Sequence, residues 1–173
     1  MLKLRLAVAS LGFAMILPAT SAVLAQTTYI APAAPLPSQI FTAKKVFISY
    51  AGEKLDPTTW SGGQAQPYNE FYAAIKSWNR YELVTAPGDA DIIFEISFAY
   101  VVEEIDLFLK TGGSIPQLKL ALIDPKTHIT LWTLNESTSI GHKQKGRDKS
   151  LQDTIAKLVG DLKALTAQPT VAK

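Results

Sequence analysis

Two runs of alternating apolar residues around one turn constrain this chain more than any other feature. Leucines recur at every second position in residues 118–122, and the alternation resumes in residues 129–133. A period of two is typical of β-strands with one buried face. Between the runs, residues 124–127 read Asp-Pro-Lys-Thr, which favours a type I turn. We predict an antiparallel hairpin whose register the leucines fix, because a slip of one residue would expose them.

Three further strands are predicted from similar patterns. Residues 44–50 and 91–102 alternate, with one fully apolar face in the longer run. Residues 81–85 form a short strand that ends before Pro87 and Gly88. The first strand, a helix and this short strand predict a crossover with parallel pairing.

Two amphipathic helices are predicted. The first covers residues 69–79, with Asn69 as its N-cap, and carries an aromatic-rich stripe. The stripe consists of Tyr68, Phe71, Tyr72, Ile75 and Trp78. Such a stripe is typical of a core face, and a carbohydrate or peptide groove is the alternative. The second helix begins at Ser150 as N-cap and ends near Thr166.

This order of elements, β-α-β-β-β-β-α, predicts an α+β fold. We expect a single mixed five-stranded sheet with two helices packed mainly on one face. The folded domain is predicted over residues 44–168, followed by a disordered tail at 169–173. Residues 26–43 contain Pro32, Pro35 and Pro37 and show no hydrophobic period, which predicts a Pro/Ala-rich linker.

The first 25 residues have the three-part order of a secretory signal peptide. Lys3 and Arg5 precede an apolar run over residues 6–17, and small residues lead to a predicted cleavage after Ala25. An uncleaved anchor is the alternative. A helix of that apolar length would span only about 18 Å of a hydrocarbon core about 30 Å thick. We therefore predict an exported protein, periplasmic or extracellular, with no transmembrane anchor after cleavage.

Charge and cysteine content exclude several classes of function. Lys3 and Arg5 belong to the predicted leader, and without them 15 basic residues balance 15 acidic residues. A chain with no net charge does not attract the phosphate backbone of nucleic acid, so no nucleic-acid partner is predicted. The chain has no cysteine, which excludes disulfides, thiol catalysis and a lipid-modified cysteine.

One local basic patch follows the predicted hairpin. It comprises His142, Lys143, Lys145, Arg147 and Lys149. A charged, glycine-containing connection on the surface explains the run without any partner. The alternative is a site for an anionic polymer, a phosphate or a protein partner.

No catalytic residue, metal ligand or cofactor site is predicted. The two histidines, His128 and His142, lie far apart in the sequence and lack the ligand spacing that zinc requires. A hydrolase would have to use His142 with Asp148, but no serine lies in a nucleophile-elbow sequence. The simplest interpretation is that His128 only flanks the turn and that His142 is exposed to solvent.

Residues 44–166 resemble small exported bacterial domains with this order of elements. The similarity rests on residues 81–84, Tyr-Glu-Leu-Val, on residues 90–94, Ala-Asp-Ile-Ile-Phe, and on the hairpin turn with Leu131-Trp132 behind it. The families are the amino-terminal domain of TolB-type proteins, lipoprotein activators of penicillin-binding proteins, and curli-secretion-type lipoproteins. This chain differs because it has neither an acylated cysteine nor a propeller. The resemblance implies an envelope protein that binds other proteins.

These observations predict a non-enzymatic protein-binding or assembly module of the cell envelope, with envelope proteins as partners. Binding of a small molecule or glycan between the aromatic helix and the sheet is the alternative, and hydrolysis is the less favoured one. No cofactor is predicted, and the sequence predicts no oligomeric state.

Overall fold

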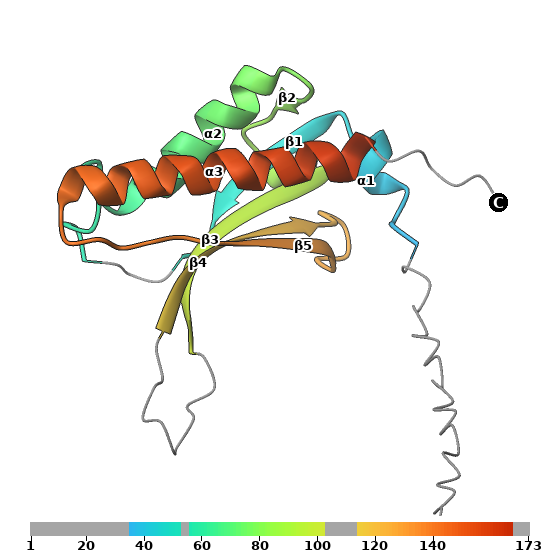
Figure 1. Ribbon diagram of the computed structural model, residues 1–173. Helices are drawn as coiled ribbons and strands as arrows, with labels where there is room; N and C mark the ends of the chain where they lie inside the picture. Colours follow the sequence, from blue (N-terminus) through green and yellow to red (C-terminus); the bar gives the residue numbers. More distant parts are fainter. Residues whose placement is uncertain (1–34, 53–55, 103–113, 168–173) are drawn as a thin grey trace, which may run out of the picture. The chain divides into compact units, whose positions relative to one another are not determined.

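The structure is a computed structural model that describes residues 35–52, 56–102 and 114–167. These residues form one mixed five-stranded sheet in the order β2-β1-β3-β4-β5. Helices α2 and α3 lie together on one face of the sheet (Figure 1). The α+β fold is therefore confirmed, together with the predicted order of strands and helices. The predicted leader, residues 26–34 of the predicted linker and the predicted tail lie outside the described residues.

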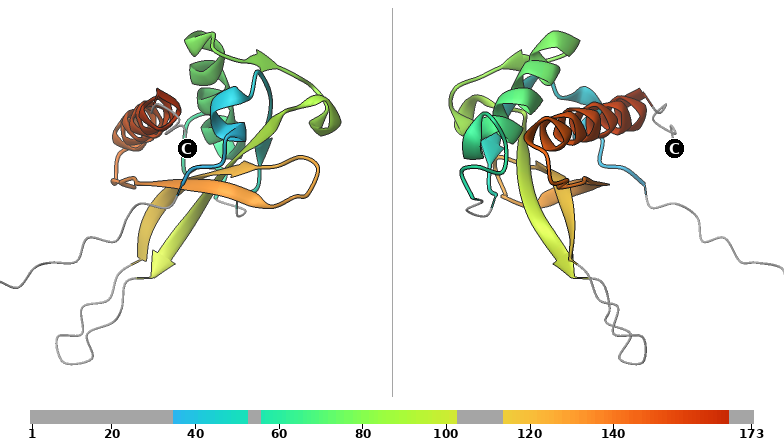
Figure 2. Two further views of the ribbon diagram at one scale, coloured as in Figure 1. Left: turned by 90° about the vertical axis from the view of Figure 1, so that its right-hand side faces the viewer. Right: turned by 60° about the vertical axis from the view of Figure 1, so that its left-hand side comes forward.

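The strands have the neighbours that the sequence patterns predict: β1 is parallel to β2 and β3, and β4 is antiparallel to β3 and β5. The predicted phase of residues 129–133 is wrong, because a longer turn and a register shift at Leu122/Ile123 leave Ile129 61% exposed and turn the even-numbered residues of β5 towards the helices. In the hairpin of β4 and β5, Leu120 lies opposite Leu134 and Leu122 opposite Trp132. Both views in Figure 2 show the helices on the same side of these strands. The strand bounds are β1 Lys45–Tyr50, β2 Glu82–Leu83, β3 Ile92–Val102, β4 Ser114–Ile123 and β5 Thr130–Ser137.

The two long helices, α2 and α3, start earlier in the chain than the sequence predicted, and the short helix α1 was not predicted. The bounds are α1 Gln39–Thr42, α2 Gln66–Trp78 and α3 Gln144–Ala167, with short 3-10 turns η1 Gly63–Ala65 and η2 Pro87–Asp89. Asn69 lies inside α2, so its prediction as the N-cap is wrong; Pro67 suits the first turn instead. Ser150 also lies inside its helix, and its hydroxyl accepts a hydrogen bond from the Ser139 amide at 2.9 Å. Ser150 therefore ties α3 to the end of β5 and is not a cap.

The core lies between the sheet and the two long helices. Every second residue over 92–98 in β3 and over 118–122 in β4 points into it, and α2 contributes Phe71 and Ile75, both fully buried. α3 contributes an apolar stripe spaced three or four residues apart. The stripe consists of Leu151, Ile155, Leu158, Val159, Leu162 and Leu165.

The turn between β4 and β5 is one residue longer than a β-turn. The His128 amide donates to the Asp124 carbonyl at 2.9 Å, and the Asp124 carboxylate accepts bonds from the Lys126 amide and the Thr127 hydroxyl. His128 closes the turn with a φ of 58°. That left-handed conformation is unfavourable for a residue with a Cβ atom.

We expect His128→Gly to stabilise the protein by about 0.5–1 kcal/mol, because glycine adopts positive φ without a steric penalty. Urea unfolding of both proteins measures the difference. His128→Ala is the control, since it removes the imidazole but keeps the Cβ atom. Equal stability of the glycine and alanine variants would show that the backbone conformation does not contribute.

The ordered structure reaches into the segment for which the prolines predicted a linker. Ile40 of α1 is only 1% exposed and belongs to the core. The Gln39 side-chain amide donates to the Asp91 carbonyl at 2.6 Å. The packed structure therefore begins before residue 44, the predicted start of the domain.

Asp91 fixes the start of two neighbouring strands. Its Oδ2 atom accepts hydrogen bonds from the backbone amides of Lys44 at 2.8 Å and Lys45 at 2.9 Å. These two amide bonds, with a smaller contribution from the two lysine charges, hold the pKa of Asp91 below its ordinary value. The ionised carboxylate thus aligns β1 with β3.

Asp91→Asn should reduce the loss of unfolding free energy that occurs as the pH falls. A carboxyl whose pKa is lower in the folded state stabilises the fold above its unfolded pKa, and this contribution is lost as the pH falls through the folded pKa. Urea unfolding at pH 7 and near pH 3 measures the loss, and the variant should lose less than the wild type. An unchanged loss would mean that the two amides do not depend on the Asp91 charge.

Candidate functional site

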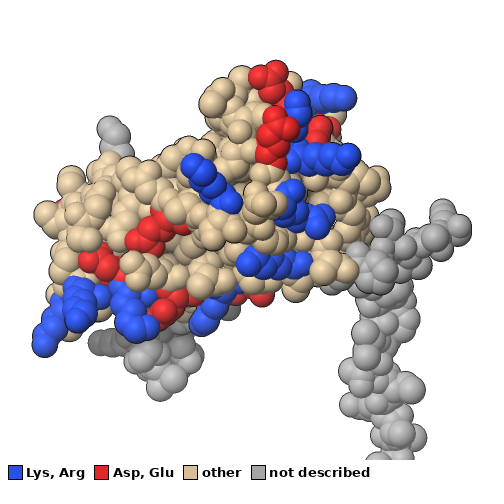
Figure 3. Space-filling model, turned by 90° about the horizontal axis from the view of Figure 1, so that it is seen from above, with Lys and Arg blue, Asp and Glu red and all other residues tan. Residues whose placement is uncertain are grey.

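The predicted basic patch lies at the start of α3. His142 and Lys143 directly precede the helix, whereas Lys145, Arg147 and Lys149 lie in its first two turns. The prediction of a loop over residues 141–149 is therefore wrong from Gln144 onwards. On the face that carries the helices, basic and acidic side chains are interspersed (Figure 3).

Arg147 uses all of its donors inside the protein. Its Nε atom donates to the Thr59 carbonyl at 2.7 Å, and Nη2 donates to the Thr58 carbonyl at 3.2 Å. Nη1 donates to the carbonyls of Gly141 and His142, and Nη2 also reaches Gln144. A guanidinium group has five N–H donors. Arg147 therefore holds residues 58–59 against α3 and has no donor left for an anion.

The other patch residues do not converge on one point. Lys149 pairs with Asp153 at 2.5 Å, with side chains that are 72% and 59% exposed. The Asp148 carboxylate accepts a bond from the Ser61 amide at 3.0 Å, and no hydrogen bond joins it to His142 among the described residues. His142, Lys143 and Lys145 are exposed. An anion or partner site at these residues stays a prediction, without Arg147 as a ligand.

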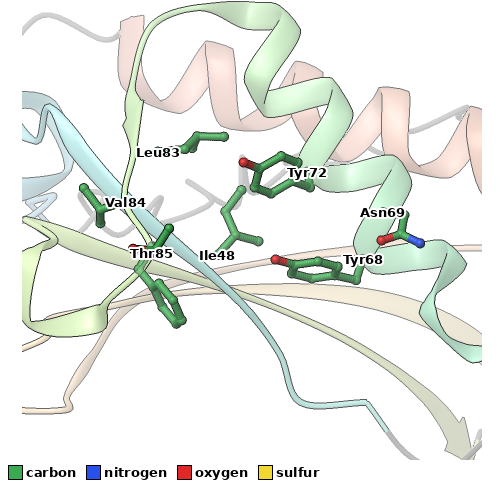
Figure 4. A pocket seen from close by; sticks show the side chains of 8 residues that line it. Ile48, Tyr68, Asn69, Tyr72, Leu83, Val84 and Thr85 are labelled. Carbon is green, nitrogen blue, oxygen red and sulfur yellow. The ribbon is translucent and has the colours of Figure 1, made fainter.

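A pocket of about 430 Å³ opens between α2 and the β1–β2 edge of the sheet. We call this pocket the β1 groove. Figure 4 shows its side chains, which come from α2, from β1, from the end of β2 and from the chain that follows β2. They are Phe47, Ile48, Tyr68, Asn69, Tyr72, Leu83, Val84 and Thr85.

Two tyrosines of α2 form one wall of the β1 groove. The rings of Tyr68 and Tyr72 lie 6.0 Å apart between centroids and are tilted by 35°. In Figure 4 both hydroxyl groups point across the pocket towards the β1–β2 side. The buried stripe positions of the same helix, Phe71 and Ile75, face the core. The predicted aromatic stripe is therefore divided between the core and this groove.

The opposite side of the β1 groove is an incomplete sheet edge. β2 pairs with β1 at only two positions, Lys45↔Glu82 and Val46↔Leu83. The Val84 amide still donates to the Val46 carbonyl, and the chain then leaves the sheet towards η2. Backbone groups of alternate residues point to the same side of a strand. Those of Ile48 and Tyr50 therefore point to the side that β2 leaves open.

This arrangement suits a neutral ligand with hydrogen-bonding groups. None of the eight lining residues is charged, and their side chains are apolar except for two phenols, an amide and a hydroxyl. No group of three His, Cys, Asp or Glu side chains suited to a metal ion occurs in the described residues. The groove offers neither an ionised side chain for proton transfer nor a nucleophile with a neighbouring base.

A second hollow, of about 370 Å³, lies beside α1 and is polar. Its two carboxylates, Asp91 and Asp124, already accept hydrogen bonds from the chain itself. We regard it as part of the packing of α1 against the sheet.

The sequence indicated a groove only as the alternative to a core stripe, because the shape of the groove depends on where β2 stops. Pro87 and Gly88 marked the end of the strand, but β2 ends at Leu83, two residues before the predicted end. Val84 and Thr85 thus become wall residues of a pocket. The spacing of Tyr68 and Tyr72 was the one available signal.

Comparisons with known proteins give only distant similarities. No protein-family model matches the sequence, and no curated protein matches it. Within the described residues, no helix has the length and apolar character needed to cross a membrane. The chain is similar in structure to several bacterial proteins, among them hypothetical proteins and lipoproteins.

Three of these structures illustrate how distant the similarity is. A hypothetical protein from Chlamydia trachomatis is 11% identical, with a TM-score of 0.47, over 72% of this chain and 98% of that one. PelC from Paraburkholderia phytofirmans, solved as a dodecamer, is 16% identical, with a TM-score of 0.47, over 75% and 93% of the two chains. A lipoprotein from Neisseria meningitidis is 14% identical, with a TM-score of 0.39, over 70% and 99%. Similarity at this level assigns neither a family nor an activity.

Proposed function

We propose that this chain is an exported, non-enzymatic protein of the cell envelope that binds an extended segment of another polypeptide in the β1 groove. The amino-terminal sequence with its predicted cleavage after Ala25 supports export. The observation that carries the binding function is the incomplete edge of β1 between β2 and the tyrosines of α2.

An extended peptide matches the hydrogen-bonding groups of this edge. Among the described residues, the backbone groups of Ile48 and Tyr50 on the β2 side have no strand partner. A peptide that continues the line of β2 would pair with them, as in other cases of strand addition. The main chain would supply affinity, and the position just beyond Leu83 would set where the peptide begins.

The tyrosine wall would select side chains of the peptide. Every second residue of an added strand points to the same face of the sheet. On the helix side these residues would meet Tyr68, Tyr72 and Leu83, which favours apolar or aromatic side chains without charge. Asn69 lies at the same wall and offers both a donor and an acceptor.

The tyrosine pair also supports a second candidate ligand, a glycan or another neutral small molecule. Aromatic rings with adjacent hydroxyl groups bind such ligands through contact area and hydrogen bonds. This candidate leaves the backbone of Ile48 and Tyr50 unused, so the two ligand classes can be distinguished by experiment.

Photo-crosslinking in cells that produce the full chain tests the peptide proposal. A photoreactive residue replaces Asn69 at the groove or, as the control, Ser77, an exposed residue on another side of the same helix. We expect a discrete crosslinked polypeptide from position 69 and none from position 77. Equal crosslinking at both positions, or none at either, would argue against a groove for polypeptides.

A second measurement separates a peptide from a glycan. A peptide taken from the crosslinked partner should lose binding when its backbone nitrogens on the β1 side are methylated, because strand addition needs those N–H groups. Tyr72→Ala should weaken the same peptide by about tenfold or more. Binding that survives methylation, or a melting temperature raised only by glycans, would favour the second candidate.

A further inference from the structure

The other edge of the sheet is formed by β5 and differs from the edge at β1. β5 comprises Thr130–Ser137 and pairs with β4 alone, at the end of the strand order. α3 packs over one face of β5 (Figure 2) but does not pair with its edge. The edge is therefore a row of backbone groups several residues long.

The pairing with β4 determines which backbone groups are free. The Thr138 amide donates to the Pro116 carbonyl at 2.9 Å, so even-numbered residues of this strand direct their backbone towards β4. Thr133 and Asn135 consequently direct their N–H and C=O groups away from the sheet, and Leu131, the extra residue at the register shift, has no partner in β4. Within residues 35–52, 56–102 and 114–167, no backbone partner for these groups is found beyond β5. The row ends at Ser137, whose carbonyl lies 3.5 Å from the Thr154 hydroxyl.

β5 has protective features of edge strands only near its two ends. Its sequence, TLWTLNES, contains no lysine and no proline. The register shift at Leu122/Ile123 makes Leu131 an extra residue near the start of β5, and Glu136 lies near its end, so residues 132–135 are regular and uncharged. An unprotected edge of this length is a template for another strand.

We propose that β5 pairs with β5 of a second copy of this chain, antiparallel, about a two-fold axis at Thr133. This pairing places Leu131 opposite Asn135 of the second copy and Thr133 opposite its own counterpart. The two Thr133 residues would exchange about two hydrogen bonds, and Asn135 of each strand would add further bonds on either side of the axis. The two sheets would become one continuous sheet with closed two-fold symmetry.

The side chains of β5 fit this pairing on the helix-covered face. Trp132 would lie opposite Leu134 of the second copy, and both side chains are only partly buried in the single chain. An aromatic–aliphatic pair of this kind stabilises a sheet. Ile129, which is 61% exposed directly before β5, would lie near the end of the second copy's strand.

The distribution of charge along β5 also favours pairing with β5 of a second copy. Glu136 is the one charged residue of β5, and in this register it would lie opposite Thr130. No like charges would therefore be directly opposed across the axis, although the two interacting strands are identical. The edge at β1 does not offer the same fit, because it is short and is bordered by the tyrosines of α2.

The test uses the mature chain, without the predicted leader, and measures its mass by sedimentation over a wide concentration range. We expect a concentration-dependent dimer. Thr133→Asp and Thr133→Lys each place two like charges opposite one another at the axis, so each variant alone should dimerise about a hundredfold or more weakly. A mixture of the two variants should dimerise again, because opposite charges then face each other.

The mixture also controls for folding, since a misfolded variant would not regain dimerisation with its counterpart. Ser137→Asp is the matched control: it adds the same charge at the end of the strand, away from the axis, and should leave the dimer nearly unchanged. A wild-type chain that stays monomeric at every concentration overturns the proposal, even if it captures another protein. Dimers that persist in both single variants overturn it as well.

Discussion

Trp60→Ala is expected to destabilise the fold by about 3–5 kcal/mol. Trp60 comes from an irregular segment, yet its side chain is only 2% exposed. Its ring meets Phe98 of β3 edge to face, with centroids 5.1 Å apart and planes at 87°. Truncation would leave a large cavity beside a fully buried phenylalanine, and the surrounding sheet cannot collapse to fill it.

Tyr100→Ala provides the matched control for this result. Tyr100 meets the same Phe98 ring in the same edge-to-face manner, at 5.4 Å, but is 45% exposed. Its removal should cost about 1 kcal/mol, since little buried volume is lost. Urea unfolding followed by circular dichroism measures both variants. Similar losses for Trp60→Ala and Tyr100→Ala would show that Trp60 does not anchor its segment in the core.

Arg147→Ala should cost about 2–3 kcal/mol of unfolding free energy. The guanidinium group joins the carbonyls of Thr58 and Thr59 to the start of α3. Without it, these carbonyls and those of Gly141 and His142 lose charge-assisted hydrogen bonds. Water can reach part of this site, because the Arg147 side chain is only partly buried. That access keeps the expected loss below the loss at Trp60.

Two controls define the role of Arg147. Lys145→Ala removes an exposed positive charge from the same helical turn and should change stability by less than about 0.5 kcal/mol. Arg147→Lys keeps the charge but lacks the planar fork of donors, so it should recover only a small part of the loss. Full recovery by lysine would mean that charge, and not the set of five bonds, holds the segment.

Residues 44–50 and the two hairpin strands were predictable because their signals are local. Alternation over residues 118–122 determines both β4 and its buried face. The run over residues 129–133 indicated the second strand but not its phase, because the turn length and the register shift at Leu122/Ile123 are not local to that run. The same holds for the helix stripes, whose period depends only on the helix itself. Local patterns therefore gave the α+β class, the order of elements and the face that carries the helices.

The starts of α2 and α3 were not predictable from capping residues. Asn69 and Ser150 are good N-cap residues, but both lie inside helices that begin several residues earlier. In α3, contacts with distant residues 58–61 hold the first turns, although Gly146 would weaken them on its own. Tertiary contacts thus override the local signal.

The candidate site was predictable only in part. Tyr68 and Tyr72 stood out as an aromatic pair at helical spacing, and a groove was one of two interpretations of that stripe. Its other wall depends on the early end of β2 and on the path of Val84 and Thr85, which no local pattern specifies. For the basic patch, the sequence suggested a binding site that the structure does not assemble. The run of charged residues gave no sign that Arg147 donates its hydrogen bonds to other parts of the protein.

The link from Arg147 and Asp148 to residues 58–61 also bears on biosynthesis. Ribosomes make the chain from the amino terminus, so the partners of this segment emerge 87 to 89 residues after it. Until then, Trp60 and its neighbours have no guanidinium or carboxylate to hold them. Such delayed closure is compatible with the export that we propose, because a chain that crosses a translocation channel must stay unfolded until it has passed.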